Sequence, residues 1–339
     1  MAYGEEPDRR PELLKILVTG ASGFIGRHVV QSVREHGQEP IPLVRRGSDI
    51  RGLGVEPEGL RYADLRDPDA LEAAVQGVDA VIHLGGLTRA KTLKAFREVN
   101  ARGVERLIVA CRRAAPDLRR FVLVSSIAAA GPGTPDRPRR EIDPCEPVTP
   151  YGRSKLEGEQ ALREGAGDLP WTIVRPPIVY GPGERDVLTL FRMCLKGLVP
   201  VVGFRDQHYS IVYGPDLADA LLDLGLHDDT TGQTYFVAEP RSYTYRELVG
   251  VIGEAVGRVP RRPRVPRLLV RLLAAGGTMA QGLRRRPPFL TLAKLPEVLA
   301  DGWVCTSDTA RALVPDVAGT SLAEGAGKTA AWYREQGWL

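Results

Sequence analysis

The fold of this chain is restricted above all by a short apolar run that leads into a glycine-rich turn. Residues 15–26 read KILVTGASGFIG. The apolar and β-branched residues at the start predict a buried strand, and the glycines predict a tight turn into a helix. Such a turn brings backbone amide groups and a helix N-terminus close to a pyrophosphate. An ordinary strand-to-helix turn is the alternative, but this order of elements favours dinucleotide binding.

Strand and helix patterns alternate through the first half of the chain. Strands are predicted at 14–19, 41–44, 60–63, 80–84, 121–125 and 171–175, and helices at 24–36, 69–75, 92–114 and 150–165. This alternation predicts an α/β fold with a doubly wound parallel sheet. After residue 178, Pro and Gly become frequent and the amphipathic segments shorten.

The same patterns suggest how the chain is divided. We expect residues 12–178 to bind a dinucleotide and residues 179–339 to form a smaller substrate-binding lobe, some of whose segments return to the sheet. Residues 1–11 are polar and charged, which predicts a flexible tail without the apolar region of a signal peptide.

Composition is that of a soluble globular protein. Hydrophobic residues make up 43% and charged residues 26%, and the net charge is only +4, so nucleic-acid binding gains no support. The cysteines and histidines show no ligand spacing, and we expect no metal site and a reducing, cytoplasmic location.

One apolar stretch, residues 268–283, stands apart because arginines flank it on both sides. It is interrupted by Arg271 and two glycines and is too short to span a bilayer. We expect an amphipathic helix that covers a substrate pocket; contact with a membrane surface is the alternative.

The end of the second predicted strand bears on cofactor choice. NAD-binding proteins usually carry an acid there, which holds the ribose 2′-hydroxyl. This chain instead has Arg45 and Arg46 after Val44. Guanidinium groups can bind a 2′-phosphate bidentately, so NADP(H) is favoured over NAD(H), unless the arginines are merely solvated. Asp64 and Leu65 close the third strand, where a carboxylate can accept a hydrogen bond from an adenine amino group.

A tyrosine and a lysine four residues apart are the candidate proton-transfer pair. Tyr151 and Lys155 share one helix face, and the ammonium, together with the positive charge of an oxidised nicotinamide, is expected to lower the pKa of the phenol. Ser126 follows an apolar strand, where its hydroxyl can stabilise a substrate oxygen. Asn100 can hold a water or a backbone group for proton relay. A solvated helix face is the alternative for any such isolated pair.

Taken in order, these residues resemble the extended short-chain dehydrogenase/reductase family, the NAD(P)-dependent epimerase/dehydratase group. The matching motifs are Thr19-Gly20-x-x-Gly23-x-x-Gly26, Asp64-Leu65, His83-Leu84-Gly85-Gly86, Asn100, Ser125-Ser126, Tyr151-x-x-x-Lys155, Arg175-Pro176, Val179-Tyr180-Gly181-Pro182 and Asp216-Leu217-Ala218.

The resemblance implies a Rossmann-type sheet and a catalytic set of Ser126, Tyr151, Lys155 and Asn100. It also implies a homodimer formed through the helices at 92–114 and 150–165. The cofactor-binding residues that we expect are Gly20, Ser22, Gly23, Phe24, Ile25, Gly26, Arg45, Arg46, Asp64, Leu65, Leu84, Gly85, Gly86, Tyr151, Lys155 and Pro176.

Departures from the family pattern narrow the expected reaction. Sugar-nucleotide dehydratases of this family carry an Asp-Glu pair after the catalytic hydroxyl residue, whereas Ser126 is followed by Ile127 and Ala128. Sugar-nucleotide epimerases usually place a diphosphate-binding arginine where this chain has Tyr209, although Arg192 or Arg205 could replace it. The remaining pattern looks more like the hydroxysteroid dehydrogenase and dihydroflavonol reductase branch.

These expectations lead to one main functional hypothesis and two alternatives. We expect an NADP(H)-dependent oxidoreductase that interconverts a ketone and a secondary alcohol on a largely apolar, steroid-like or similar small molecule. The first alternative is a nucleotide-sugar epimerase with tightly bound NAD. The second is a non-catalytic NAD(P)-sensing or scaffold protein on the same fold.

Overall fold

A computed structural model describes residues 13–203, 205–280 and 290–339. The predicted tail at 1–11 and the last part of the apolar stretch, with the arginines after it, lie outside the described residues.

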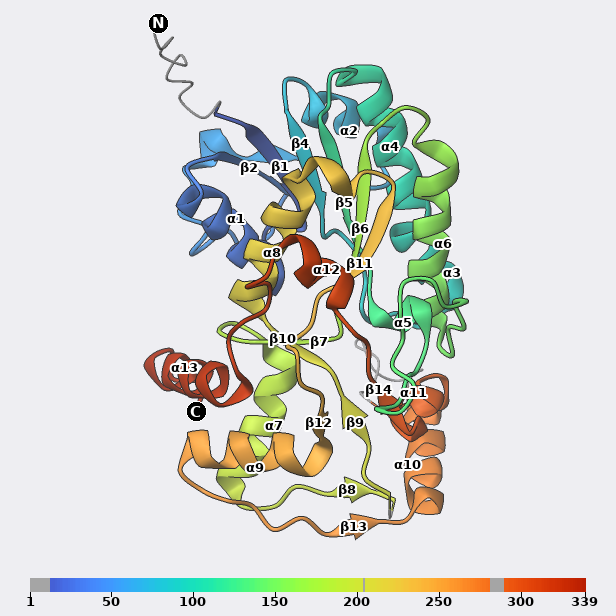
Figure 1. Cartoon of the computed structure of the whole chain (residues 1–339), viewed down its shortest axis with the longest axis vertical. Coiled ribbons are helices and arrows are strands. Elements are labelled where there is room, and N and C mark those ends of the chain that lie inside the picture. The colour runs from blue at the N-terminus through green and yellow to red at the C-terminus, as the bar shows by residue number, and fades with distance from the viewer. Residues whose placement is uncertain (1–12, 204, 281–289) are drawn as a thin grey trace, which may run out of the picture.

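A seven-stranded parallel sheet forms the centre of the molecule (Figure 1). Its strand order is β11-β6-β5-β4-β1-β2-β3. The strands are β1 (Lys15–Thr19), β2 (Glu39–Val44), β3 (Arg61–Tyr62), β4 (Ala80–His83), β5 (Arg120–Val124), β6 (Trp171–Arg175) and β11 (Gln233–Phe236). The order reverses direction between β1 and β4, which defines a doubly wound sheet and confirms the predicted fold class. Strand β11 comes from the second half of the chain and pairs with β6.

Helices cover both faces of this sheet. On one face lie α1 (Phe24–Glu35) and α8 (Gly214–Leu226); on the other lie α2 (Pro68–Val75), α4 (Arg102–Ala114) and α6 (Pro150–Gly165) (Figure 1). Successive residues of a strand point to opposite faces. Accordingly, Ile16 and Val18 of β1 belong to the core under α1, whereas Leu17 between them belongs to the core under α4.

The predicted helix at 92–114 is two helices, which corrects the sequence interpretation. Helix α3 (Leu93–Asn100) ends at Ala101, where φ is −111° and ψ is −61°, and α4 begins at the next residue. A Cβ on Gly158 of α6 would lie 2.3 Å from the Asn100 carbonyl oxygen. The interruption therefore lies where the backbones of the two segments approach most closely, a constraint that apolar periodicity does not reveal.

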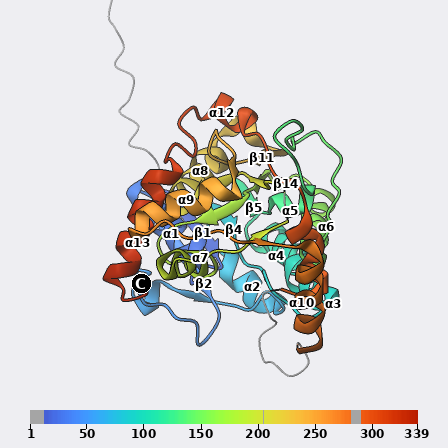
Figure 2. The ribbon, with the colours of Figure 1, turned by 90° about the horizontal axis from the view of Figure 1, so that it is seen from below.

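The remaining elements form a lobe below the carboxyl ends of the sheet strands (Figures 1 and 2). Its pairs are β7 (Ile178–Tyr180) with β10 (Ile211–Tyr213), β9 (His208–Tyr209) with β12 (Tyr243–Thr244) and β14 (Gly302–Trp303), and β8 (Val201–Val202) with β13 (Arg264–Val265). Its larger helices are α7 (Arg185–Lys196), α9 (Tyr245–Val256), α10 (Arg267–Ala280) and α13 (Leu322–Glu335), with α11 (Leu295–Leu299) beside α10. The short helix α12 (Asp308–Leu313) packs next to β11, on the face of the sheet that α1 and α8 cover. A separate core holds the lobe together, with Phe191 and Tyr333 edge to face at 5.2 Å between ring centroids.

Candidate active site

The glycine-rich turn lies between β1 and α1 and has no room for larger side chains. Gly20 has a φ of +70°, and a Cβ there would lie 3.0 Å from the backbone nitrogen of Gly85. A Cβ on Gly26 would lie 2.3 Å from the Gly20 carbonyl oxygen. The Gly23 amide donates to that same oxygen at 2.9 Å. The turn is therefore compact enough for a ligand phosphate to approach its backbone.

The helix that follows begins with its amide groups available to a ligand. Phe24 is its first residue, and its N-cap, Gly23, provides no side-chain cap. Ser22 lies in the turn itself, and its carbonyl oxygen accepts a hydrogen bond from Arg27 at 3.2 Å. Ile25 packs against the hydrophobic core, so its side chain anchors the helix on the sheet.

The end of β4 lies beside this turn. The Thr19 hydroxyl accepts a hydrogen bond from the Gly85 amide at 3.0 Å and lies 2.7 Å from Nδ1 of His83. A Cβ on Gly85 would lie 3.1 Å from the side chain of Leu65. One on Gly86 would lie 3.1 Å from that of Asn100. Leu84, Gly85 and Gly86 thus lie together with the ends of β1 and β3, as the motif pattern predicts for parallel strands.

The two arginines after β2 are exposed, and Arg46 lies over the Tyr62 ring at 5.5 Å from its centroid. Asp64 pairs with Arg66 through two hydrogen bonds of 2.8 Å. These bonds, aided by Arg45, lower the pKa of Asp64 to about 2. An adenine amino group would have to share this carboxylate with Arg66.

Helix α6 carries the candidate proton-transfer pair. Its N-cap is Thr149, whose hydroxyl accepts from the Gly152 amide at 3.0 Å, and Pro150 follows in the first turn. Lys155 Nζ donates to the carbonyl oxygen of Val124, the last residue of β5, at 2.6 Å. Burial lowers the pKa of Lys155 to about 8, opposed by Glu159 one turn further along the helix.

Tyr151, in the first turn of α6, and Ser126, which follows β5, lie close together. Burial raises the pKa of Tyr151 to about 12, a hydrogen bond with Ser126 opposes the rise, and Glu297 adds to it. The sequence analysis expected a lowered pKa from Lys155 together with an oxidised nicotinamide; in the structure described, burial raises the pKa of Tyr151 instead. Ser126 also caps the short helix α5 (Ile127–Ala130), accepting from Ala128 at 3.1 Å. Pro176 is adjacent, since its carbonyl oxygen accepts from the Ile127 amide at 2.9 Å.

Asn100 joins two parts of the site through its side chain. Its Oδ1 accepts from the Leu87 amide at 2.7 Å, and its Nδ2 donates to the Leu87 carbonyl at 2.9 Å. The same Nδ2 donates to the Ser154 hydroxyl at 2.9 Å. Asn100 therefore holds a backbone group, one of the two possibilities that the sequence left open, and ties the loop after β4 to α6.

A buried ion pair under α6 was not recognised from the sequence. Arg175 donates from Nε and a terminal nitrogen to Glu159 at 2.8 and 2.6 Å, and both side chains are buried. The Ser125 hydroxyl donates to the same carboxylate at 2.6 Å. Two sequence signals could have indicated the pair: an arginine closing an otherwise apolar strand, and a glutamate one helical turn after Lys155.

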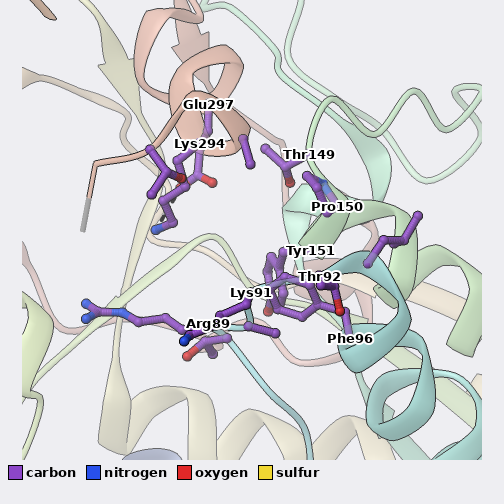
Figure 3. A pocket seen from close by; sticks show the side chains of 14 residues that line it. Arg89, Lys91, Thr92, Phe96, Thr149, Pro150, Tyr151, Lys294 and Glu297 are labelled. Carbon is purple, nitrogen blue, oxygen red and sulfur yellow. Dashed lines mark ion pairs between the residues drawn. The ribbon is translucent and has the colours of Figure 1, made fainter. Parts of the chain in front are cut away.

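Tyr151 also lines a cavity of about 90 Å³ between α3, the start of α6 and the segment before α11 (Figure 3). Apolar side chains from Leu93, Phe96 and Pro150 contribute to its wall. Lys294 and Glu297, 3.8 Å apart, approach from the opposite side. The cavity lining is Thr88, Arg89, Ala90, Lys91, Thr92, Leu93, Phe96, Thr149, Pro150, Tyr151, Thr291, Ala293, Lys294 and Glu297. A substrate held here would have its reacting group at the Tyr151 phenol.

A glycine turn between the first strand of a doubly wound parallel sheet and the helix that follows it is typical of the dinucleotide-binding α/β proteins. Comparison with known proteins agrees. The model of the NAD dependent epimerase/dehydratase family matches residues 16–238. The chain therefore belongs to this family, which confirms the resemblance seen in the sequence.

Individual relatives include both reductases and epimerases. The chain is 32% identical over 330 residues to a protein named ceramide reductase from Caulobacter vibrioides, covering 96% of each. It is 29% identical over 275 residues to 2-alkyl-3-oxoalkanoate reductase from Stenotrophomonas maltophilia, covering 76% of this chain and 78% of that one. The crystal structure of Thermus thermophilus UDP-glucose 4-epimerase in complex with NAD matches with a TM-score of 0.73 and 25% identity, covering 95% of this chain and 99% of the other. Family and relatives indicate an NAD(P)-dependent oxidoreductase or epimerase.

Proposed function

We propose that the protein is an NADP(H)-dependent oxidoreductase that interconverts a ketone and a secondary alcohol on a largely apolar small molecule. The observation that carries this proposal is the position of Tyr151, which lines the cavity and lies close to Ser126. A carbonyl oxygen placed between the two hydroxyls would accept a hydrogen bond from each.

The pKa values favour proton donation to a ketone. Burial keeps Tyr151 as a protonated phenol at neutral pH, because its pKa is raised to about 12. A phenol in this form can donate its proton to the carbonyl oxygen as that oxygen becomes a hydroxyl. Lys155, with a pKa of about 8, is still mainly charged at neutral pH and stabilises the phenolate that remains.

The glycine-rich turn fits a dinucleotide, because a Cβ at Gly20 or Gly26 would meet neighbouring backbone atoms, and its absence lets the turn stay tight at the start of α1, where a pyrophosphate binds. When bound, NADP(H) supplies or accepts the hydride at the substrate carbon. Arg45 and Arg46 would hold its 2′-phosphate, since both are exposed after β2 and no acid occupies the strand end. Lys155 would also hydrogen-bond the nicotinamide ribose.

The cavity supports a substrate with both apolar and polar parts. Leu93 and Phe96 offer apolar contacts, whereas Lys91, Lys294 and Glu297 offer charged groups. Two relatives that match most of this chain are named as reductases, one of ceramide and one of 2-alkyl-3-oxoalkanoates. We therefore place the substrate among long-chain ketones with a polar end, within the largely apolar class proposed above.

A direct assay tests this function. The purified protein is first checked for cofactor carried through purification, and then incubated with NADPH or NADH and a series of long-chain 3-oxo compounds with polar ends. We expect the protein to arrive without cofactor and to oxidise NADPH in the presence of at least one ketone. Tightly held NAD⁺ together with no turnover of any ketone would reject the proposal.

A nucleotide-sugar epimerase is the second candidate, favoured by the structural match to UDP-glucose 4-epimerase. The residue at the position of the family's diphosphate-binding arginine counts against it. Tyr209 lies where the family pattern places a diphosphate-binding arginine, and its hydroxyl donates to Gln207 at 3.3 Å. Arg192 instead donates to the Trp338 carbonyl at 2.9 Å, and neither it nor Arg205 lines the cavity. Conversion of UDP-glucose by the purified protein would favour this candidate.

A further inference from the structure

Helix α10 presents an apolar face to solvent. Leu268, Leu272 and Met279 follow one row along the helix and are 68%, 62% and 83% exposed. Leu269 and Leu273 form the neighbouring row and are also exposed. Residues three or four apart share a helix face, so these five side chains make one continuous apolar strip. Soluble proteins rarely leave such a strip uncovered unless it serves an interaction.

The orientation of this strip is set by packing on the other side of the helix. Val270 and Ala274 are buried. The Thr278 hydroxyl accepts from the Leu292 amide at 2.9 Å, which joins α10 to the segment before α11. Because the face of α10 that carries Val270 and Ala274 packs against the protein, the leucines of the strip point away from it.

Exposed arginines lie on α10 and in the segment before it. Arg271 is exposed on α10 itself, and Arg261 is exposed in the segment that leads into the helix. Arg267 pairs with Asp301 at 3.0 Å and adds no net charge. An exposed apolar helix face bordered by arginines has the character that binds an anionic bilayer surface.

The strip is also close to the cavity. The segment that packs against α10 contributes Thr291, Ala293 and Lys294 to the cavity wall, whereas no residue of α10 lines it. Both views of the molecule place α10 on the same side as α3, which forms another wall (Figures 1 and 2). The expectation that this helix covers the pocket therefore needs revision, because α10 supports one wall from behind and exposes its leucines beside it.

We propose that α10 docks this protein on an anionic lipid bilayer, with the leucine strip in the headgroup region and the cavity beside the membrane surface. None of the helices among the described residues has the length and hydropathy of a membrane span, and α10 has only 14 residues. The helix would lie in the interface instead. Docking does not depend on the reaction proposed above. If the protein catalyses that reaction, docking on the bilayer also explains how an apolar substrate reaches the site.

Vesicle sedimentation tests the docking surface. The full chain is mixed with phosphatidylcholine vesicles that contain none or about 30% phosphatidylserine, at low and high salt. We expect binding to the anionic vesicles that weakens with salt. The double variant Leu268→Ser/Leu272→Ser should lower the partition coefficient roughly tenfold or more, because it removes the apolar contact. Ile142→Ser is the matched control, since Ile142 is 82% exposed but lies in the loop before α6.

A second variant separates the charge contribution. Arg261→Gln/Arg271→Gln should weaken binding to anionic vesicles severalfold and leave binding to neutral vesicles unchanged. Circular dichroism and thermal unfolding should be the same for all variants, because every substituted side chain is exposed.

Three outcomes would overturn the proposal. One is no binding of the wild type to anionic vesicles, and another is equal binding by wild type and the leucine variant. The third is a wild type that self-associates without binding vesicles and becomes monomeric in Leu268→Ser/Leu272→Ser, which would assign the strip to a second copy of the chain. Tyr151→Phe should bind vesicles like wild type, so failure of the proposed reaction would leave this result intact.

Discussion

Lys155 donates a hydrogen bond of 2.6 Å to the carbonyl oxygen of Val124, which ties the middle of α6 to the end of β5. Tyr151 lies one turn before Lys155, and Ser126 lies two residues after Val124. A single contact between helix and strand therefore helps to fix the distance between the two hydroxyl groups. It also holds the ammonium in a buried position, which accounts for the lowered pKa of Lys155.

The first prediction concerns the pH dependence of ketone reduction. The pKa of Lys155 is lowered to about 8, so its positive charge is lost as pH rises through that value. Tyr151 keeps its proton over the same range because its pKa is about 12. We expect kcat/KM for reduction to be level near neutrality and to fall above about pH 8. A rate that still climbs at pH 9 would contradict this assignment.

A second prediction separates an enzyme from a cofactor sensor. Tyr151→Phe removes the proton donor but keeps the ring, which packs 6.0 Å from Phe96 between centroids. Turnover should fall by about 10²–10⁴-fold, the usual contribution of a positioned acid, while the affinity for NADPH changes little. Steady-state kinetics and cofactor titration measure the two effects. Unchanged turnover would remove Tyr151 from the mechanism.

The sequence predicted the sheet well because most of its first six strands contain a short apolar run before a turn or helix; β3 is the exception, with only Arg61 and Tyr62. The break at Ala101 was missed because residues 92–114 keep a helical pattern throughout. The break lies next to the close approach of Gly158 to the Asn100 carbonyl, a contact between segments far apart in the chain. Local sequence patterns predict helices and strands, but they do not predict which backbone segments will come into contact.

In the candidate site, too, local patterns predicted some features, whereas contacts between distant residues decided others. Motif order placed Ser126, Tyr151 and Lys155 in one region, since their positions depend on strand ends and helix periodicity, and their catalytic role stays a prediction. The direction of the Tyr151 pKa could not be obtained this way. It depends on burial and on the negative charge of Glu297, which is 146 residues away in the chain.

A third prediction tests cofactor choice. Arg45→Ala should weaken NADPH binding about tenfold, the scale of one lost charge-assisted hydrogen bond, and leave NADH binding unchanged. Arg51→Ala is a suitable control, because Arg51 is exposed and paired with Asp49 at 2.8 Å. Thermal shift with each nucleotide measures the preference. Equal losses for both nucleotides would show that Arg45 does not read the 2′-phosphate.

A fourth prediction concerns the glycine-rich turn. Gly26→Ala places a Cβ 2.3 Å from the Gly20 carbonyl oxygen, so α1 must shift away from the turn. We expect a loss of about 1–3 kcal/mol in unfolding free energy, together with weaker nucleotide binding. Gly327→Ala in α13 has nothing within 4 Å of its new Cβ and should stabilise the protein by about 0.4–1 kcal/mol. Urea unfolding compares the two; a neutral Gly26→Ala would mean that the turn is looser than described.

The last prediction concerns the buried pair of Glu159 and Arg175. Arg175→Met leaves the Glu159 carboxylate buried without its main partner, which should cost about 3–5 kcal/mol of unfolding free energy. Arg163→Met removes a half-exposed partner 3.2 Å from the same carboxylate and should cost at most about 1 kcal/mol. Urea unfolding at neutral pH measures both. Similar losses in the two variants would mean that burial of the pair does not matter.

The pH dependence of stability provides an independent check on the same pair. In the wild type, Arg175 and Ser125 hold the pKa of Glu159 below its usual value despite burial. The folded state then binds fewer protons than the unfolded state, so this contribution is complete above about pH 4.3 and is lost as pH falls through the lower folded pKa. In Arg175→Met, only Ser125 and Arg163 remain to oppose the effect of burial on Glu159. The pKa of Glu159 in the folded variant should therefore rise above its pKa in the unfolded chain. The contribution of Glu159 to the unfolding free energy of the variant then decreases as pH rises. The difference in unfolding free energy between wild type and variant should therefore widen from pH 4 to pH 7. A difference that is constant over this range would show that the carboxylate keeps its low pKa without Arg175.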